Sequence, residues 1–481
     1  MKYETVIGLE VHVELATDTK IFCSCSAHSF GAAPNTNICP VCLGMPGTLP
    51  RLNKKVVDYA IKAGMMLGCH INRTSSFDRK SYFYPDLPNA YQITQYFSPI
   101  ATDGVVEIET SMGKKCIRIA EMHIEEDAGK LIHDLQEGMT HIDFNRAGVP
   151  LLEIVSQPDL SSADEVEAYL ERLKTLLRYA SVAECEMAHG TMRCDVNLSV
   201  RPEGSQTLGV RTEMKNMNSI DAIKRAIDYE TVRHINILEH DTEELRQETR
   251  RWDEAKGKTV PMRQKETAGD YRYAPDPNLM PLTIGEEWIE NVRSSLPEFP
   301  EVKRERYMKE HGLSAYDTEQ LIKSIAICTC FEEAAAVCHS SKDAANWMMG
   351  EVMSLLNAKQ MTYDMLAIDG CGLGELILLV MEGKVGRANA RIILDAMFED
   401  ATISPEAYAK ENGYLISNNT AEIESVVKAI VDADPKSVAD YKSGKEKVLM
   451  FLFGKCMKAL KGNCNPQLLR TILCNRIAED H

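Results

Sequence analysis

Two short segments of the chain alternate acidic and histidine side chains with apolar ones. They are Glu10-Val11-His12-Val13-Glu14 and Glu121-Met122-His123-Ile124-Glu125. Because successive side chains of a β-strand point to opposite faces, each segment directs Glu, His and Glu to one face of a sheet. Two such strands predict the floor of a divalent-cation site. Solvated charges on a half-exposed antiparallel sheet would produce the same alternation, and that is the alternative.

Polar side chains also alternate along two later segments, which predicts two more strands with one polar face. A face that carries both carboxylates and cations fits a metal ion with bound phosphate better than it fits water alone. The residues that would share a face are Arg193, Asp195, Asn197 and Arg201 in residues 193–201, and Arg211, Glu213 and Lys215 in residues 210–215.

Four cysteines form two close pairs separated by a loop of 13 residues. Thiolates at this spacing can close a tetrahedral zinc site that holds together a loop with little core of its own. Because four cysteines would fill all four positions, we predict structural rather than catalytic zinc; four unligated thiols are the alternative. The cysteines are Cys23, Cys25, Cys39 and Cys42.

A run of cations and aromatic rings at residues 77–86 could hold a phosphorylated substrate. Arg79 and Lys80 are suited to phosphate, and Tyr82 and Tyr84 to orienting a polar substrate, although aromatic-rich strands are usually core. The sequence contains no Walker-type loop and no strand-linked G-x-G-x-x-G motif. If ATP binds, metal ions and a sheet face must therefore hold it.

Composition restricts the class of protein. A length of 481 residues predicts two or three domains, and 44% hydrophobic with 26% charged residues is ordinary for a soluble protein. The 15 cysteines favour a reducing compartment, and no apolar run approaches the roughly 18 residues needed to span a bilayer. We expect a cytoplasmic protein with no membrane partner.

The periodicity of the chain predicts an α+β protein in three parts. Residues 1–292 are strand-rich, with one helix capped by Ser162 and another capped by Ser219 that directs Ile223, Ile227 and Leu238 inward. Apolar residues then recur at helical spacing. We predict a catalytic domain with the cysteine loop at residues 1–292, a helical domain at residues 293–405 and a small helical tail domain at residues 406–481.

Charge is distributed unevenly. A net charge of −17 argues against general affinity for nucleic acid, but the end of the chain is basic. Four lysines there would form one stripe on a helix, which could bind a polyanion or be merely solvated. They are Lys447, Lys455, Lys458 and Lys461.

Together these motifs resemble the GatB family, the B subunits of the tRNA-dependent amidotransferases. The matching segments are residues 3–15 (Y-E-T-V-I-G-L-E-V-H-V-E-L), 78–86, 123–130, 193–195 and 248–250. The resemblance implies a catalytic domain of the glutamine synthetase type, in which an antiparallel sheet carries metal-bound ATP. It also implies that the side chain of mischarged Glu-tRNA(Gln) or Asp-tRNA(Asn) is phosphorylated by ATP and then amidated. The ammonia would come from glutamine hydrolysed by a partner glutaminase, the A subunit of the complex, with the C subunit as a further partner.

The resemblance also implies roles for individual residues. Glu121 stands where the family often has arginine, so we expect Glu14, Glu121 and His123 to support the site rather than hold the ion. A zinc-stabilised tRNA-binding scaffold without chemistry is the alternative function. Whether Glu-tRNA(Gln), Asp-tRNA(Asn) or both are substrates stays open. The expected catalytic and Mg²⁺ residues are Glu10, His12, Glu125, Asp195 and Glu213, with Glu126 as an added Mg²⁺ neighbour. The expected ATP and substrate residues are Arg79, Lys80, Tyr82, Tyr84, Arg193 and Lys215, and the four tail lysines are expected to bind tRNA.

Overall fold

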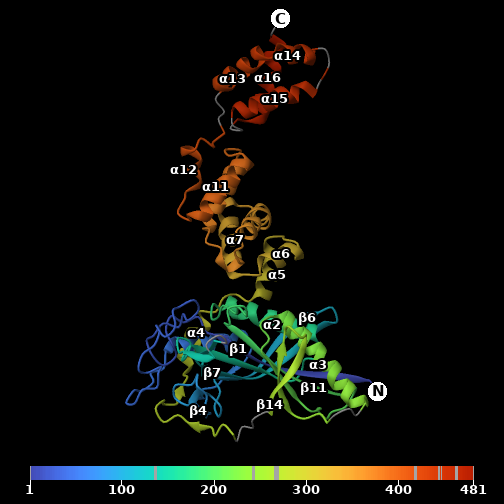
Figure 1. Ribbon diagram of the computed structural model, residues 1–481. Helices are drawn as coiled ribbons and strands as arrows, with labels where there is room; N and C mark the ends of the chain where they lie inside the picture. The colour runs from blue at the N-terminus through green and yellow to red at the C-terminus, as the bar shows by residue number, and fades with distance from the viewer. Residues whose placement is uncertain are drawn as a thin grey trace. The chain divides into compact units, whose positions relative to one another are not determined.

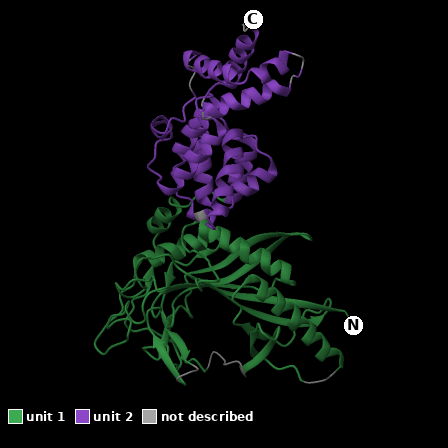
Figure 2. Cartoon of the chain, turned by 45° about the horizontal axis from the view of Figure 1, so that its top comes forward, with its two compact units in different colours: residues 1–299 green, residues 300–481 purple. Residues whose placement is uncertain are grey.

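The computed structural model describes residues 2–134, 138–240, 244–264, 270–416, 420–442, 445, 447–460 and 464–479. The chain forms two compact units, residues 1–299 (unit 1) and 300–481 (unit 2), coloured green and purple in Figure 2. Unit 1 mixes helices with a large, mainly antiparallel sheet, and unit 2 is built of helices. This confirms the predicted α+β class with a helical C-terminal region. The three-part division remains a prediction.

Unit 1 contains a large sheet, smaller sheets and four named helices among its described residues (Figure 1). The strands are β1 Tyr3–Glu14, β2 His70–Ile71, β3 Thr74–Ser75, β4 Asp78–Ser81, β5 Tyr91–Thr94, β6 Ala101–Thr110, β7 Gly113–Glu126, β8 Lys130–Asp134, β9 Met139–Asp143, β10 Pro150–Ser156, β11 Met192–Pro202, β12 Thr212–Lys215, β13 Glu248–Asp253, β14 Lys258–Gln264, β15 Ala274–Pro275 and β16 Leu282–Thr283. The helices are α1 Lys54–Met66, α2 Ala163–Tyr179, α3 Ile220–His240 and α4 Glu286–Arg293.

The large sheet has the strand order β14-β13-β12-β11-β1-β10-β7-β6-β2. Every pair is antiparallel except β12 with β13, which run parallel. β1 lies between β11 and β10, so Glu10 pairs with Asp195 on one side and His12 pairs with Glu153 on the other. This register brings side chains that are far apart in the sequence onto one face.

Helices α1, α2 and α3 pack against the other face of the sheet (Figure 1). Their apolar side chains meet the buried alternate residues of the strands, such as Val11 and Val13 of β1, which are fully buried. The Ser162 and Ser219 side chains each accept a backbone N–H in the first turn of α2 and α3, so both predicted caps are confirmed. The prediction that Leu238 points inward is wrong, because this side chain is 43% exposed. Ile237 is buried instead, since it lies about four helical turns from Ile223 and therefore on the same face of α3.

A buried ionic cluster attaches α3 to the β13–β14 edge of the sheet. Glu230 of α3 is fully buried, and its Oε1 lies 2.6 Å from Arg233 Nε and 3.2 Å from Arg250 Nε. Arg250 also donates to the hydroxyl and carbonyl oxygens of Thr259. The two guanidinium groups and the threonine hydroxyl compensate the carboxylate for its lost hydration.

Unit 2 is made of helices, which pack in two groups. α12 packs on α10 and α11, and Val385 bridges to Leu415, whereas the helices after residue 420 surround an apolar cluster that includes Ile423, Leu452 and Leu473. Among the described residues of the chain, no helix combines the length and apolar character needed to cross a membrane. The elements are α5 Pro300–Glu310, α6 Ala315–Leu321, α7 Ile325–Cys338, α8 Ser341–Trp347, a π-helical turn η1 Met348–Val352, α9 Met353–Ala358, a 3₁₀ turn η2 Tyr363–Met365, α10 Gly370–Met381, α11 Arg387–Glu399, α12 Pro405–Glu411, α13 Thr420–Ala433, α14 Pro435–Lys442, α15 Lys447–Ala459 and α16 Pro466–Glu479.

The buried cluster predicts a large effect of removing Glu230, the fully buried one of its two carboxylates. The other, Glu248, lies with its Oε1 2.8 Å from Arg250 and 3.3 Å from Arg233. Glu230→Ala should lower the free energy of unfolding of unit 1 by about 3 kcal/mol, because Arg233 and Arg250 lose their fully buried partner and keep only the partly exposed Glu248. Urea denaturation followed by tryptophan fluorescence, to which the buried Trp252 of β13 contributes, measures this loss. As a control, Glu107→Ala removes an exposed ion pair with Lys114 and should leave the midpoint nearly unchanged. Equal midpoints for the two variants would contradict the assigned role of the cluster.

Candidate functional site

The face of the large sheet opposite its helices forms the floor of a cavity of about 850 Å³ within unit 1. The floor consists of alternate side chains of β1, β7, β10, β11, β12 and β13. Lys80, Tyr82, Tyr96, Tyr271 and Tyr273 form a wall on one side. The cavity therefore combines an acidic floor with a wall of rings and cations.

One acidic cluster lies where β1, β11 and β12 are adjacent. One carboxylate oxygen from each of Glu10, Asp195 and Glu213 lies within 4.8 Å of the other two. The ammonium group of Lys215 forms an ion pair with Asp195 Oδ2 and lies 3.4 Å from Glu213 Oε1. Burial alone would lower the pKa of Lys215, but Asp195 and Glu213 raise it, so the amine is charged here.

A second cluster consists of His12, Glu125 and Glu153, with ligand atoms again within 4.8 Å of one another. His12 Nε2 lies 3.3 Å from Glu125 Oε1 and 3.8 Å from Glu153 Oε2. Burial by itself would lower the pKa of His12, but Glu153 and Glu125 raise it to about 9. The surrounding carboxylates therefore favour positive charge at the position of this imidazole.

Glu153 was missed by the sequence analysis. It is the lone charged residue in β10, whose other residues are Pro150, Leu151, Leu152, Ile154, Val155 and Ser156. A single charged residue inside such an apolar strand is the feature of the sequence that could have indicated a functional role for Glu153. Only the pairing of β10 with both β1 and β7 brings Glu153 opposite His12 and His123.

The three polar residues of the second Glu-His-Glu segment, Glu121, His123 and Glu125, have different surroundings. His123 Nε2 lies 3.2 Å from Glu121 Oε1, and Nδ1 lies 2.6 Å from the Gln95 carbonyl oxygen. Burial would lower the pKa of His123, but Glu121 and the nearby acidic groups raise it to about 9. Both residues line the cavity, and neither belongs to a metal-capable cluster among the described residues. From this segment, Glu125 alone joins the second cluster.

Glu126 is not brought to either cluster. Because it follows Glu125 on β7, its side chain points the other way and lines a separate cavity of about 210 Å³ near the cysteine loop. Its Oε1 accepts a hydrogen bond from the Ile93 amide at 3.0 Å. Burial raises the pKa of Glu126 to about 7.

The donor atoms of the two clusters fit divalent cations that prefer oxygen. Glu10, Asp195 and Glu213 offer carboxylate oxygens only, which is the chemistry of a Mg²⁺ site. His12, Glu125 and Glu153 offer two carboxylates and one imidazole, a set compatible with Mg²⁺ or Mn²⁺. The residues present therefore fit a pair of hard cations.

The expected phosphate and substrate residues separate into two groups. Lys80, Tyr82, Arg193 and Lys215 line the cavity, and the Lys80 ammonium lies 4.9 Å from the centre of the Tyr271 ring.

Arg79 and Tyr84 are absent from the cavity lining. Arg79 Nε lies 2.6 Å from Asp276 Oδ2, with the guanidinium over the Tyr91 ring, and Tyr84 is half exposed elsewhere. Alternation along β4 directs Lys80, and not Arg79, toward the site.

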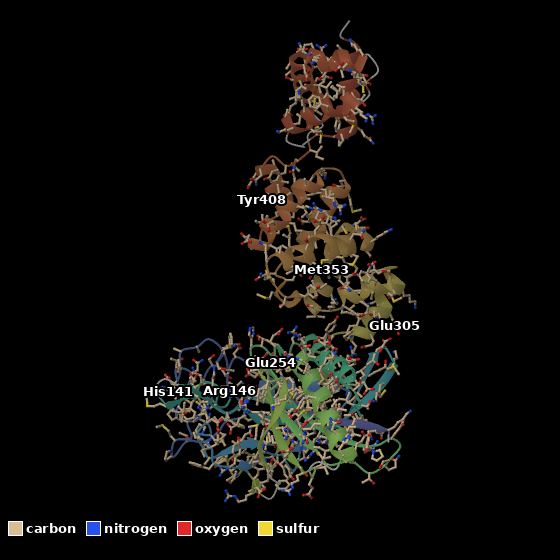
Figure 3. The ribbon with its side chains drawn as sticks, turned by 45° about the vertical axis from the view of Figure 1, so that its right-hand side comes forward. His141, Arg146, Glu254, Glu305, Met353 and Tyr408 are labelled. Carbon is tan, nitrogen blue, oxygen red and sulfur yellow. The ribbon has the colours of Figure 1, made fainter. Side chains whose placement is uncertain are left out.

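Two guanidinium groups share one carboxylate in the cavity, and one of them, Arg193, pairs across the strands with His12 of the second cluster. Arg193 of β11 and Arg146, labelled in Figure 3 on the segment between β9 and β10, both pair with Asp127 Oδ2. Burial of Glu14 and its nearness to Asp127 raise the pKa of Glu14 to about 7. Arg211, expected on the polar face with Glu213 and Lys215, also lines the cavity, and so does Gln247.

The four predicted cysteines converge. One Sγ atom from each lies within 4.8 Å of the others, and the Sγ atoms of Cys39 and Cys42 are 3.9 Å apart. In a tetrahedral site with Zn–S bonds of about 2.3 Å, sulfurs stand about 3.8 Å apart. A hydrogen bond from Cys23, with Lys20 nearby, lowers the pKa of Cys42 to about 5. The hydrogen bond with Cys42 and burial raise the pKa of Cys23, and burial raises that of Cys25 to about 11. Among these three thiols, Cys42 therefore loses its proton first.

The tail lysines are exposed on α15. Lys447, Lys455 and Lys458 point to solvent, while Leu449 and Leu452 are buried. Lys455 Nζ lies 2.8 Å from Asp434 Oδ2, so part of its charge is compensated within the unit. Lys461 lies outside the described residues.

Comparison with known proteins finds two family models along the chain. Residues 5–290 match the GatB/GatE catalytic domain, and residues 329–477 match the GatB domain. Similar curated proteins include one from Caldicellulosiruptor saccharolyticus, 51% identical over 477 residues and 98% of each chain. Another, from Caldanaerobacter subterraneus subsp. tengcongensis, is 48% identical over 479 residues and all of each chain. A third, from Clostridium tetani, is 47% identical over 474 residues and 98% of each chain. All three are named as the B subunit of an aspartyl/glutamyl-tRNA(Asn/Gln) amidotransferase.

Replacing the two adjacent glutamates of β7 by glutamine should change the stability of the protein in opposite directions at pH 8. The pKa of Glu126 is 4.5 in the unfolded chain and about 7 in the folded protein. Because the buried carboxyl group ionises less readily than the exposed one, the folded state becomes less stable as pH rises from 4.5 to 7. Glu126→Gln should leave stability unchanged near pH 4.5 and raise it by up to about 3 kcal/mol at pH 8. Denaturant unfolding at the two pH values measures this difference.

Glu125 provides the matched control. Burial would raise the pKa of Glu125, but its hydrogen bond with His12 and the charges of His12 and Lys80 lower it. Glu125→Gln should therefore destabilise the protein at pH 8. A stabilised Glu125→Gln, or a destabilised Glu126→Gln, would contradict the opposite orientations of the two side chains.

Proposed function

Because the chain belongs to the GatB family of amidotransferase B subunits, we propose that it carries out the ATP-dependent step of tRNA transamidation. The observation that carries this proposal is the cavity in which two metal-capable clusters face a wall of cations and aromatic rings. The relatives' names are those of an enzyme component, which disfavours the alternative of a scaffold without chemistry. The antiparallel sheet is consistent with the expected glutamine synthetase type of domain.

The substrates are ATP and a mischarged tRNA, Glu-tRNA(Gln) or Asp-tRNA(Asn). An oxygen of the aminoacyl side-chain carboxylate attacks the γ-phosphorus of ATP, and ADP leaves. Ammonia then attacks the acyl carbon, and inorganic phosphate leaves to give the amide. The glutaminase (A) partner would supply the ammonia from glutamine, and the C partner would complete the assembly.

The floor residues would hold the metal ions. Glu10, Asp195 and Glu213 hold one Mg²⁺, and His12, Glu125 and Glu153 hold a second. When bound, the ions neutralise and clamp the transferring phosphoryl group. Asn197 keeps Glu10 in place by donating to its Oε1 at 2.8 Å, and Thr249 donates to Glu213 Oε2 at 2.7 Å.

The cations around the floor would bind and orient the phosphate groups. Lys80 and Lys215 are compact charges that line the cavity, and Arg193, opposite His12 on the neighbouring strand, carries a planar guanidinium group. Tyr82, Tyr271 and Tyr273 provide ring faces and hydroxyl groups beside Lys80 that could orient the substrate. Their rings also help exclude water from the reacting groups.

The two other sites take supporting roles in this proposal. Cys23, Cys25, Cys39 and Cys42 bind a structural zinc ion that stabilises their loop, as the converging thiols support. The exposed lysines of α15 bind the phosphate backbone of tRNA.

Loss of one floor carboxylate should stop amidation without stopping glutamine hydrolysis. Glu10→Gln and Glu125→Gln, each reconstituted with the glutaminase and C partners, should lower amidation of mischarged tRNA by about 100-fold or more. Glutamine hydrolysis should survive, because its chemistry belongs to another chain. Product aminoacyl-tRNA and released glutamate are measured in parallel.

An exposed carboxylate on β6 provides the control for this assay. Glu107→Gln lies outside the cavity lining and should amidate at the wild-type rate. Full amidation by Glu10→Gln or Glu125→Gln would overturn the proposed function.

The cysteine cluster should contain about one zinc ion per chain. Elemental analysis of the purified protein measures it, and Cys39→Ser should remove most of the metal and loosen the loop to proteolysis. Cys116→Ser, which changes an exposed cysteine outside the cluster, should retain the zinc. Equal zinc contents in the two variants would be incompatible with the assigned ligands.

A further inference from the structure

The ammonium group of Lys215 lies between two carboxylates of the first cluster. It forms an ion pair with Asp195 and lies 3.4 Å from Glu213, while those two carboxylates and Glu10 are within 4.8 Å of one another. Mg²⁺ needs oxygens at about 2.0–2.1 Å and therefore must sit between the same carboxylates. The ammonium and the metal ion would carry like charges within a few ångströms of each other. One must leave when the other arrives.

The carboxylates are held more firmly than the lysine. Glu213 is buried and accepts a hydrogen bond from the buried Thr249 hydroxyl, and Glu10 accepts one from Asn197. The Lys215 side chain is 35% exposed and lines the open cavity. Its four-carbon stem can turn without disturbing the strand. The lysine is therefore the group that moves.

We propose that Lys215 is an internal counterion which exchanges with a divalent cation only when a triphosphate arrives. Without nucleotide, the ammonium offsets part of the negative charge of Glu10, Asp195 and Glu213 and competes with metal for these carboxylates. With nucleotide, the ammonium moves onto phosphate oxygens, and the metal takes its place among the carboxylates.

This exchange makes the binding of metal and of nucleotide cooperative. The triphosphate offers Lys215 a new partner, so nucleotide raises the affinity of the cluster for metal, and metal raises the affinity for nucleotide by the same factor. The cluster contains a cation at each stage, so three close carboxylates are never left without any compensating charge. This inference rests on the proposed function, because it takes the triphosphate to be ATP bound over the floor.

The rival explanation is a permanent ion pair. In that case Lys215 would stabilise the β11–β12 edge throughout, and the first cluster would never hold a metal ion. The two explanations differ in what removal of the ammonium does to metal affinity.

The experiment measures Mn²⁺ binding to the full-length chain without nucleotide, by the electron paramagnetic resonance of free Mn²⁺. Lys215→Met keeps the length of the side chain and removes its charge. It should tighten Mn²⁺ binding at the first cluster about tenfold or more. Glu10→Gln identifies which class of bound Mn²⁺ belongs to that cluster.

Arg211→Met is the matched control. Arg211 flanks Glu213 on the side opposite Lys215, lines the same cavity and is exposed, and in the described part of the chain it forms no ion pair. Losing its solvent-screened charge should change Mn²⁺ affinity by no more than about threefold. Circular dichroism checks the fold, and Lys215→Gln replaces Lys215→Met if the latter does not fold.

A second arm adds a non-hydrolysable ATP analogue. The analogue should raise the Mn²⁺ affinity of the wild type by a larger factor than that of Lys215→Met, and Lys215→Met should bind the analogue more weakly. Mn²⁺ affinity in Lys215→Met that equals or falls below the wild-type value without nucleotide would overturn the exchange. The proposed function fails separately, through amidation that survives Glu10→Gln.

Discussion

The concentration of carboxylates on one half-buried sheet face is the constraint on which unit 1 depends. Glu10, Asp195 and Glu213 form one cluster and Glu125 and Glu153 form part of another, where their charges repel and lose hydration. The protein compensates them with cations of its own. Lys215 pairs within the first cluster, and His12 gains a proton affinity well above that of a free imidazole in the second. This balance is the basis of the proposed exchange of Lys215 for a metal ion.

Holding those charges in register requires a rigid support behind them. The apolar alternate residues of β1 pack under α1, α2 and α3, so the same strand that carries Glu10 and His12 is anchored by Val11 and Val13. The strands β12 and β13 are short, and the buried ion pair between Glu230 and Arg250 links α3 to β13. Thr249 sits on the cavity side of β13 and donates to Glu213. Packing on one face therefore fixes the geometry on the other.

Much of the site could be predicted because strand alternation is a local property. Glu10, His12, Asp195 and Glu213 follow period two in the sequence and share the cavity floor in the structure. The same rule, applied more strictly, would have separated Lys80 from Arg79 and Glu125 from Glu126, since neighbours point to opposite faces. The cysteines also converged as their spacing indicated. Their metal, and the three-part division of the chain, remain predictions.

The sequence by itself determined which side chains face together along each strand, where α2 and α3 begin, and which family the chain resembles, because these depend on neighbours in the chain. Only the tertiary structure decided which strands lie side by side. The order β12-β11-β1-β10-β7 brought Glu153 to His12 and Lys215 to Asp195. Backbone hydrogen bonds between strands are nearly indifferent to side-chain identity, so strand order is set by the packing of the whole sheet against its helices. The composition of the two clusters followed from that packing.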